Sequence, residues 1–178
     1  MKKIAAVLAL IAGSAFVTTP AFAQIAGFNG TWTLNPTASE GPQAACEYLH
    51  YQVTADEEHY IVDEMSKEGE PFHTEYRAKF DGKEYANKNL VTGATNYVKL
   101  RKVFDRTEQL TNIRREKGAD GKEVSKVGGH YIRVLAPDGK SITSTLINAE
   151  GQVTAVRVFD KVDYKGTRPT CQKAPAKT

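Results

Sequence analysis

The chain has little of what metal sites and thiol chemistry require. Its 178 residues include two cysteines and four histidines, and none stands in a Cys-x-x-Cys, His-x-His or His-Glu-x-x-His spacing. Those spacings mark zinc sites and redox dithiols. A Gly-x-Ser-x-Gly elbow and a phosphate-binding glycine loop are also missing. We therefore predict no cofactor and no metal, and the sequence offers no set of catalytic residues.

Long hydrophobic runs are lacking except at the start of the chain. Lys2 and Lys3 precede an apolar run over residues 4–17, and the small-residue pattern Ala-Phe-Ala follows at 21–23. This arrangement is typical of a secretory signal with cleavage after Ala23. The run is too short for a membrane-spanning helix, which needs roughly 20 apolar residues. We expect export to the periplasm or secretion, with no integration into the membrane.

An excess of charge of one sign is lacking as well. The formal net charge is +3, but loss of Lys2 and Lys3 with the signal leaves 22 Lys+Arg against 21 Asp+Glu, a net charge of +1. Both signs are interspersed, as on an ordinary solvated surface. The charge therefore gives no reason to expect a nucleic-acid partner.

The residues that remain after the signal suit one domain, which we place at 24–166 and follow with a tail at 167–178.

Both cysteines follow the cleavage point. An even pair in an oxidising compartment is most simply a disulfide, and here it would join Cys46 to Cys171. Such a bond would hold the tail near the start of the domain. The alternatives, a metal pair or a catalytic thiol, need a nearby histidine or a Cys-x-x-Cys spacing.

Helical periodicity is not sustained anywhere after the signal, whereas segments of period two alternate with short turns. The candidate strands are Gly30–Leu34, Glu47–Ala55, Glu58–Met65, Phe72–Phe80, Glu84–Ala86, Asn96–Phe104, Glu108–Lys117, Val124–Leu135, Ser141–Asn148 and Val153–Val162. Turns such as Pro137-Asp138-Gly139 imply antiparallel neighbours, and Gly128-Gly129 within a strand indicates a bulge or bend. We predict an all-β fold, an antiparallel up-and-down β-barrel of about 8–10 strands, since closure removes exposed edges.

Alternation along the strands predicts an apolar interior, in which a recurring aliphatic face is punctuated by aromatic and hydroxyl groups. The residues placed inside on three late strands are Val98, Leu100, Phe104, Ile132, Val134, Val156 and Val158. The opposite face carries Tyr97, Arg101, Tyr131, Arg133 and Arg157. We place this Tyr/Arg set outside, because buried unpaired arginines are costly and no acidic partner is evident on that face. A slip of one residue would instead turn it inward as a carboxylate-binding cluster.

The segment Phe28-Asn29-Gly30-Thr31-Trp32-Thr33-Leu34-Asn35 is similar to the Gly-x-Trp signature that opens the first strand of lipocalins and related calycin barrels. The segments 75–85, 98–100, 137–143 and 158–161 resemble a group of exported bacterial lipocalin-like proteins, so that the likeness covers most of residues 28–162. The resemblance implies a β-barrel, small-molecule binding by analogy, and a Trp32 side chain that plugs the closed end.

Four functions fit this pattern. The first is a periplasmic binding barrel for a small hydrophobic or amphipathic molecule. Its predicted lining residues are Trp32, Tyr51, Tyr76, Leu100, Ile132 and Val156. The second is a structural or interaction module of the envelope with a filled core, and the third is an isomerase or cyclase with His59 and Asp63 as acid and base. The fourth, an outer-membrane barrel, is disfavoured because charges recur along the strands.

Overall fold

The computed structural model describes residues 25–171. The predicted signal and its cleavage point, together with the end of the tail, lie outside these residues. The described chain begins with the short 3-10 helix η1 (Ala26–Phe28) and continues in ten strands. These are β1 (Gly30–Leu34), β2 (Cys46–Val53), β3 (Glu57–Met65), β4 (Pro71–Lys79), β5 (Tyr85–Asn89), β6 (Thr95–Phe104), β7 (Thr107–Lys117), β8 (Glu123–Leu135), β9 (Ser141–Ile147) and β10 (Val153–Val162).

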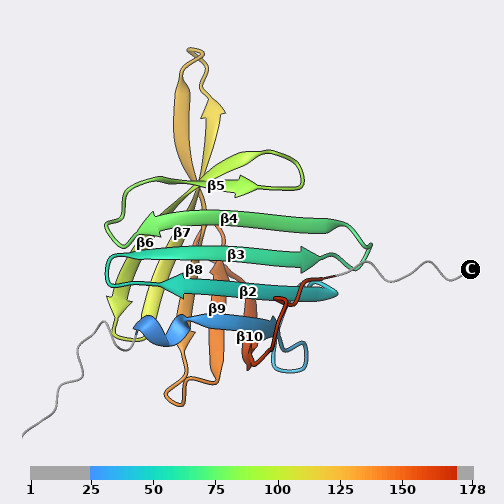
Figure 1. Cartoon of the computed structure of the whole chain (residues 1–178). Helices are drawn as coiled ribbons and strands as arrows, with labels where there is room; N and C mark the ends of the chain where they lie inside the picture. The colour runs from blue at the N-terminus through green and yellow to red at the C-terminus, as the bar shows by residue number, and fades with distance from the viewer. Residues whose placement is uncertain (1–24, 172–178) are drawn as a thin grey trace, which may run out of the picture.

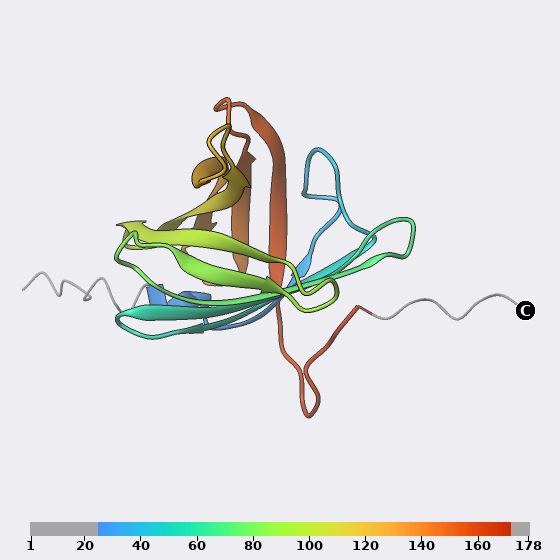
Figure 2. The same cartoon turned by 90° about the horizontal axis from the view of Figure 1, so that it is seen from above.

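Each strand pairs antiparallel with the next along the chain, and β1 closes the sheet by pairing with β10. The predicted all-β up-and-down barrel is therefore confirmed. Figures 1 and 2 show β2, β3 and β4 side by side, crossing the strands of the second half of the chain at a steep angle. The β7–β8 hairpin projects beyond the rest of the barrel (Figure 1).

One end of the barrel is closed by apolar side chains. Trp32 and Phe28 are fully buried there, and the Trp32 indole Nε1 donates a hydrogen bond of 2.8 Å to the Phe28 carbonyl oxygen. Phe159 and Ile142 face each other across β10 and β9 and extend the same core. Helix η1, shown in blue in Figure 1, covers this end. The burial of Trp32 agrees with a plug at the closed end.

The interior is less aliphatic than predicted, because β8 and β10 face the other way. Arg133 is 3% exposed and Val134 is 41% exposed, the reverse of the predicted orientation. Partners across an antiparallel pair point to the same side of the sheet, and the pairs Glu108–Arg133 and Arg133–Ser144 run along the inner wall. Arg157, opposite Ser144, continues that row on β10.

The outward-facing valines of β10 are partly covered by another segment. The loop after β1 bonds to Val156, whose carbonyl oxygen accepts from the Glu40 N–H at 2.7 Å. Ser39 Oγ accepts a hydrogen bond from the Val158 N–H at 2.8 Å. An aliphatic outer face can thus be half-buried without facing the barrel interior, and the prediction that Val156 and Val158 point inward is wrong.

The prediction for β6 is confirmed in part. Val98 and Leu100 are fully buried, whereas Phe104 is 74% exposed because the register shifts between Lys102 and Phe104. Tyr97 remains on the outer face as predicted, where the Arg115 guanidinium lies 3.7 Å from the ring centroid.

Two local predictions are also confirmed. The register of β7 and β8 shifts at the Gly128-Gly129 step, as expected for a bulge. Gly129 has a φ of +138°, and a Cβ there would lie 2.6 Å from the Ile147 carbonyl oxygen, so glycine is required. The Cys46–Cys171 disulfide is formed, with 5.8 Å between the Cα atoms. It holds the segment after β10 against the outside of the barrel.

Candidate functional site

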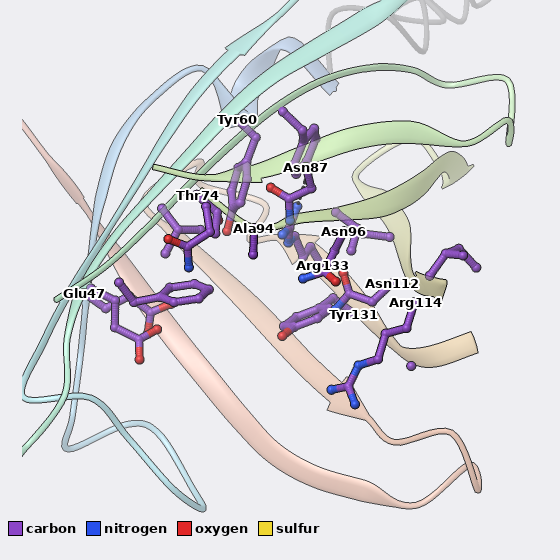
Figure 3. Close-up of a pocket in the computed structure, with 18 of the residues that line it drawn as sticks. Glu47, Tyr60, Thr74, Asn87, Ala94, Asn96, Asn112, Arg114, Tyr131 and Arg133 are labelled. Atoms are coloured by element: carbon purple, nitrogen blue, oxygen red, sulfur yellow. Dashed lines mark hydrogen bonds between the residues drawn. The ribbon is translucent and has the colours of Figure 1, made fainter. Parts of the chain in front are cut away.

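The end of the barrel opposite η1 contains a cavity of about 210 Å³. It opens where the β3–β4, β5–β6 and β7–β8 connections meet. Its walls combine tyrosine and aliphatic side chains with amides, arginines and carboxylates. The main lining residues are Glu47, Tyr60, Val62, Glu64, Phe72, Thr74, Tyr76, Asn87, Asn89, Ala94, Asn96, Leu110, Asn112, Ile113, Arg114, Tyr131, Arg133 and Arg157. Figure 3 shows many of these side chains around the pocket.

A buried charged cluster lies at the base of this cavity. Arg133 Nη1 donates to Glu108 Oε1 at 2.9 Å and to the Tyr76 hydroxyl at 3.2 Å. The Tyr76 hydroxyl donates in turn to Glu58 Oε1 at 2.6 Å. Arg133 Nη1 lies 3.6 Å from the same Glu58 oxygen. Four side chains from β3, β4, β7 and β8 thus form one network, and the two carboxyl groups share one cation.

The protonated form of Glu58 is favoured in this cluster. Burial raises the pKa of Glu58 well above its usual range, and the neighbouring Glu108 charge and a hydrogen bond to Glu108 raise it further. Glu58 Oε2 and Glu108 Oε2 are both buried and have no donor among the described residues. A proton on Glu58 directed at Glu108 gives both oxygens a partner.

Tyrosine rings surround this cluster. The Tyr60 ring lies 4.7 Å from that of Tyr51 and 5.0 Å from that of Tyr76, measured between centroids. The Arg133 guanidinium stands 4.2 Å from the Tyr60 centroid, within cation–π range. Burial raises the pKa of all three tyrosines, so that they remain neutral phenols. The rings give the cavity base a flat and partly apolar surface.

A second ion pair lies nearer the mouth. Arg157 Nη1 donates to Glu47 Oε2 at 2.8 Å and lies 3.7 Å from Glu64 Oε2. Burial raises the pKa of Glu47 to about 7; the Arg157 charge opposes this shift and the Glu64 charge adds to it. Arg157 Nε is buried without an acceptor among the described residues. Glu47 therefore titrates near neutral pH.

Amide side chains line the wall between these two clusters. Asn89 has a structural role, because its Oδ1 accepts the backbone N–H groups of Val91 and Thr92, both at 2.9 Å. The side chains of Asn87, Asn96 and Asn112 make no hydrogen bond to any described residue, and Asn87 Oδ1 is buried without a donor. Asn87 thus keeps a buried acceptor without a protein partner, while the half-buried Asn112 and the exposed Asn96 present amides that no described side chain engages.

The structure brings only some of the predicted lining residues to this cavity. Tyr76 lines it. Tyr51 is buried behind Tyr60, and Trp32 and Leu100 belong to the apolar core. The prediction that Ile132 and Val156 face the interior is wrong, because β8 and β10 turn Arg133 and Arg157 inward instead. A ligand-binding role for Trp32, Tyr51, Tyr76 and Leu100 stays a prediction.

The predicted acid/base pair is not brought together. His59 lies on the outer face of β3, where its Nε2 is 2.6 Å from Glu75 Oε1 and its Nδ1 is 3.2 Å from Gln52 Oε1. Its nearest carboxylate is thus Glu75 and not Asp63.

No group of three or more metal-ligating side chains occurs among residues 25–171. Within the same range, no helix is long and apolar enough to cross a membrane.

The fold and the site together define a class, a closed ten-stranded antiparallel barrel of calycin-like architecture with a small polar cavity at one end. No protein-family model and no curated protein matches the chain.

Proposed function

We propose that this protein is an extracytoplasmic, lipocalin-like barrel that binds a small amphipathic molecule in the cavity opposite η1. The observation that carries the proposal is a concave site inside the barrel with two buried polar atoms, Asn87 Oδ1 and Arg157 Nε, that have no partner among the described residues. Buried polar groups are almost always paired in folded proteins. A ligand that pairs with them accounts for their presence in this position.

The lining favours an amphipathic ligand over a purely hydrophobic one. Val62 and Leu110 offer apolar contacts, while the amides and two ion pairs offer polar ones. At about 210 Å³ the cavity exceeds the roughly 150 Å³ that accommodates benzene in a protein core. The ligand is therefore a little larger than one aromatic ring.

The disulfide supports a location outside the cytoplasm, because such bonds persist in oxidising compartments. This agrees with the export signal predicted from the sequence. The cavity also favours a binding barrel over an envelope module with a filled core.

Native mass spectrometry of the full chain, purified after export in its own host, tests this function. Ala94 lines the cavity near its mouth and is exposed, so Ala94→Trp fills the opening without disturbing the core. Ala119→Trp, in the exposed β7–β8 turn, is the matched control. We expect a bound small molecule on the native chain and on Ala119→Trp, and its loss from Ala94→Trp. A native chain without bound mass, or unchanged binding by Ala94→Trp, would overturn the proposal.

A further inference from the structure

We propose that the cavity selects a neutral molecule with a carboxamide-type edge, bound by Asn87, Asn96 and Asn112, and with a small aromatic or apolar body. This inference rests on the proposed binding function and names the chemical class of its ligand. Figure 3 shows the three asparagines around one part of the pocket, close to Arg133 and Tyr131.

The strand register places these amides together. Asn87 on β5 and Asn96 on β6 are direct cross-strand partners, and Asn112 on β7 is opposite Val98, two residues after Asn96. On the other side, Asn87 is the partner of Tyr76 on β4. Each asparagine offers one acceptor oxygen and two N–H donors. One wall thus carries both donors and acceptors, and it is complementary to an edge that also carries both.

The balance of charge favours a neutral ligand. Arg133 is neutralised by Glu108, and Arg157 lies between Glu47 and Glu64. Each arginine already has a carboxyl group beside it, which weakens its attraction for an anion. Arg114 also lines the cavity, but it is exposed to solvent, where a single charge contributes little.

The rest of the lining fits a small aromatic or apolar body. Tyr60 and Tyr76 present rings to the cavity from one wall, and Leu110 and Tyr131 are cross-strand partners on another. Aromatic rings pack well against other flat groups in tilted or offset arrangements. In a ligand with a ring joined to a carboxamide, the ring can pack against the tyrosine and leucine side chains while the carboxamide bonds to the asparagines.

Benzamide, benzoate and toluene test this selectivity, because they share one ring and differ in the group attached to it. We expect benzamide to bind about tenfold tighter than benzoate or toluene at pH 7. One or two additional hydrogen bonds supply a free-energy difference of this size. Dissociation constants are measured by chemical-shift titration of the disulfide-bonded chain. Ala94→Trp should abolish the shifts at the cavity.

Asn87→Leu is the decisive variant, because leucine has nearly the same shape and no hydrogen-bonding groups. We expect it to remove the preference for benzamide while leaving the unfolding midpoint unchanged or higher, since Asn87 has no side-chain partner among the described residues. A purely structural asparagine would lower the midpoint instead. Lys88→Leu, on the outer face of the same strand, is the control and should retain the preference.

The outcomes separate this inference from the proposed function. Tightest binding of benzoate would assign the cavity to anions and overturn the neutral-ligand inference, and equal or tighter binding of toluene would overturn the role of the amides. In both cases the cavity still binds, so the proposed function stands. If none of the three binds, the carboxamide inference is overturned, and the mass spectrometry of the exported chain decides the proposed function independently.

Discussion

Removal of the buried arginine provides a quantitative test of the inward orientation of β8. Arg133→Met keeps much of the side-chain volume but removes the only cation within hydrogen-bonding distance of Glu108 among the described residues. Breaking a buried ion pair on one side costs about 3–5 kcal/mol, because the remaining charge stays buried without compensation. The stacking on Tyr60 adds up to about 2 kcal/mol in a desolvated site.

The expected loss is about 3–5 kcal/mol from the ion pair, with up to about 2 kcal/mol more from the stacking. This is large against the roughly 5–15 kcal/mol by which domains are usually stable. Urea unfolding at pH 7 with the disulfide intact measures it as a lower midpoint at constant slope. The double variant Glu108→Met/Arg133→Met should recover most of the loss, since an apolar pair of similar volume leaves no charge unpaired. A loss below about 1 kcal/mol for Arg133→Met, typical of a surface position, would refute the inward orientation of Arg133.

Glu58 and Glu108 should respond differently to the same substitution, because burial raises the pKa of Glu58. Glu58→Gln retains an acceptor for the Tyr76 hydroxyl and a donor toward Glu108, so its cost should stay within about 1 kcal/mol. Glu108→Gln leaves Arg133 buried without its ionised partner and should cost about 3 kcal/mol or more. Equal costs for the two variants in the same urea assay would contradict a protonated Glu58 that donates to Glu108.

Three further predictions concern other parts of the barrel. The folded protein holds a proton on Glu47 up to about pH 7, whereas the unfolded chain releases it near the ordinary carboxyl pKa of 4.5, so the stabilising contribution of this proton falls as pH rises through this window. Glu47→Gln should flatten the unfolding free energy against pH there by up to about 3 kcal/mol, and an unchanged slope would contradict the raised pKa. Replacing both Cys46 and Cys171 with serine should lower stability by up to about 5 kcal/mol in thermal or urea unfolding, given the sequence separation of 125 residues, and no loss would show that the crosslink does not constrain the unfolded chain. Gly129→Ala should cost at least about 1 kcal/mol by the same measurement, because its Cβ would collide with the Ile147 carbonyl oxygen, and a neutral effect would argue against this bulge.

The strand pattern and the turns were sufficient to predict the architecture. Period-two segments separated by short Gly- and Asp-containing turns specify sequential antiparallel neighbours, and ten such segments close without an edge. The bulge at Gly128-Gly129 was predictable for the same local reason. The disulfide followed from the number of cysteines and from the compartment inferred from the apolar start of the chain.

The lining of the cavity was not predictable in the same way, because sheet orientation depends on partners far apart in the sequence. On β8, Tyr131 and Arg133 alternate with Ile132 and Val134, and a local reading places the aliphatic pair inside. The register decides otherwise, since Arg133 stands opposite Glu108 on β7.

A signal for the correct orientation was nevertheless present in the sequence. On β7, Glu108 and Leu110 lie on the same face of the strand. Leu110 is expected to face the core, so Glu108 is expected to face it too. On β3 the same relation links Glu58 to Tyr60 and Val62. Two glutamates on otherwise apolar faces require a buried cation. The sequence therefore contained the acidic partners whose apparent lack argued against an inward Tyr/Arg set.

The depth of the polar groups explains why one interior can be both core and binding site. At the η1 end, the Phe28 carbonyl oxygen accepts the Trp32 indole N–H, and deeper in the barrel Arg133, Tyr76, Glu58 and Glu108 form one hydrogen-bonded network. Nearer the mouth, Asn87 and Arg157 each keep a buried polar atom without a partner. A fold selected for stability alone would have apolar side chains at those positions, because an unsatisfied buried group costs about 1–3 kcal/mol. Asn87 Oδ1 and Arg157 Nε line the cavity that a ligand can enter, so binding can offset the cost of leaving these two atoms without a protein partner.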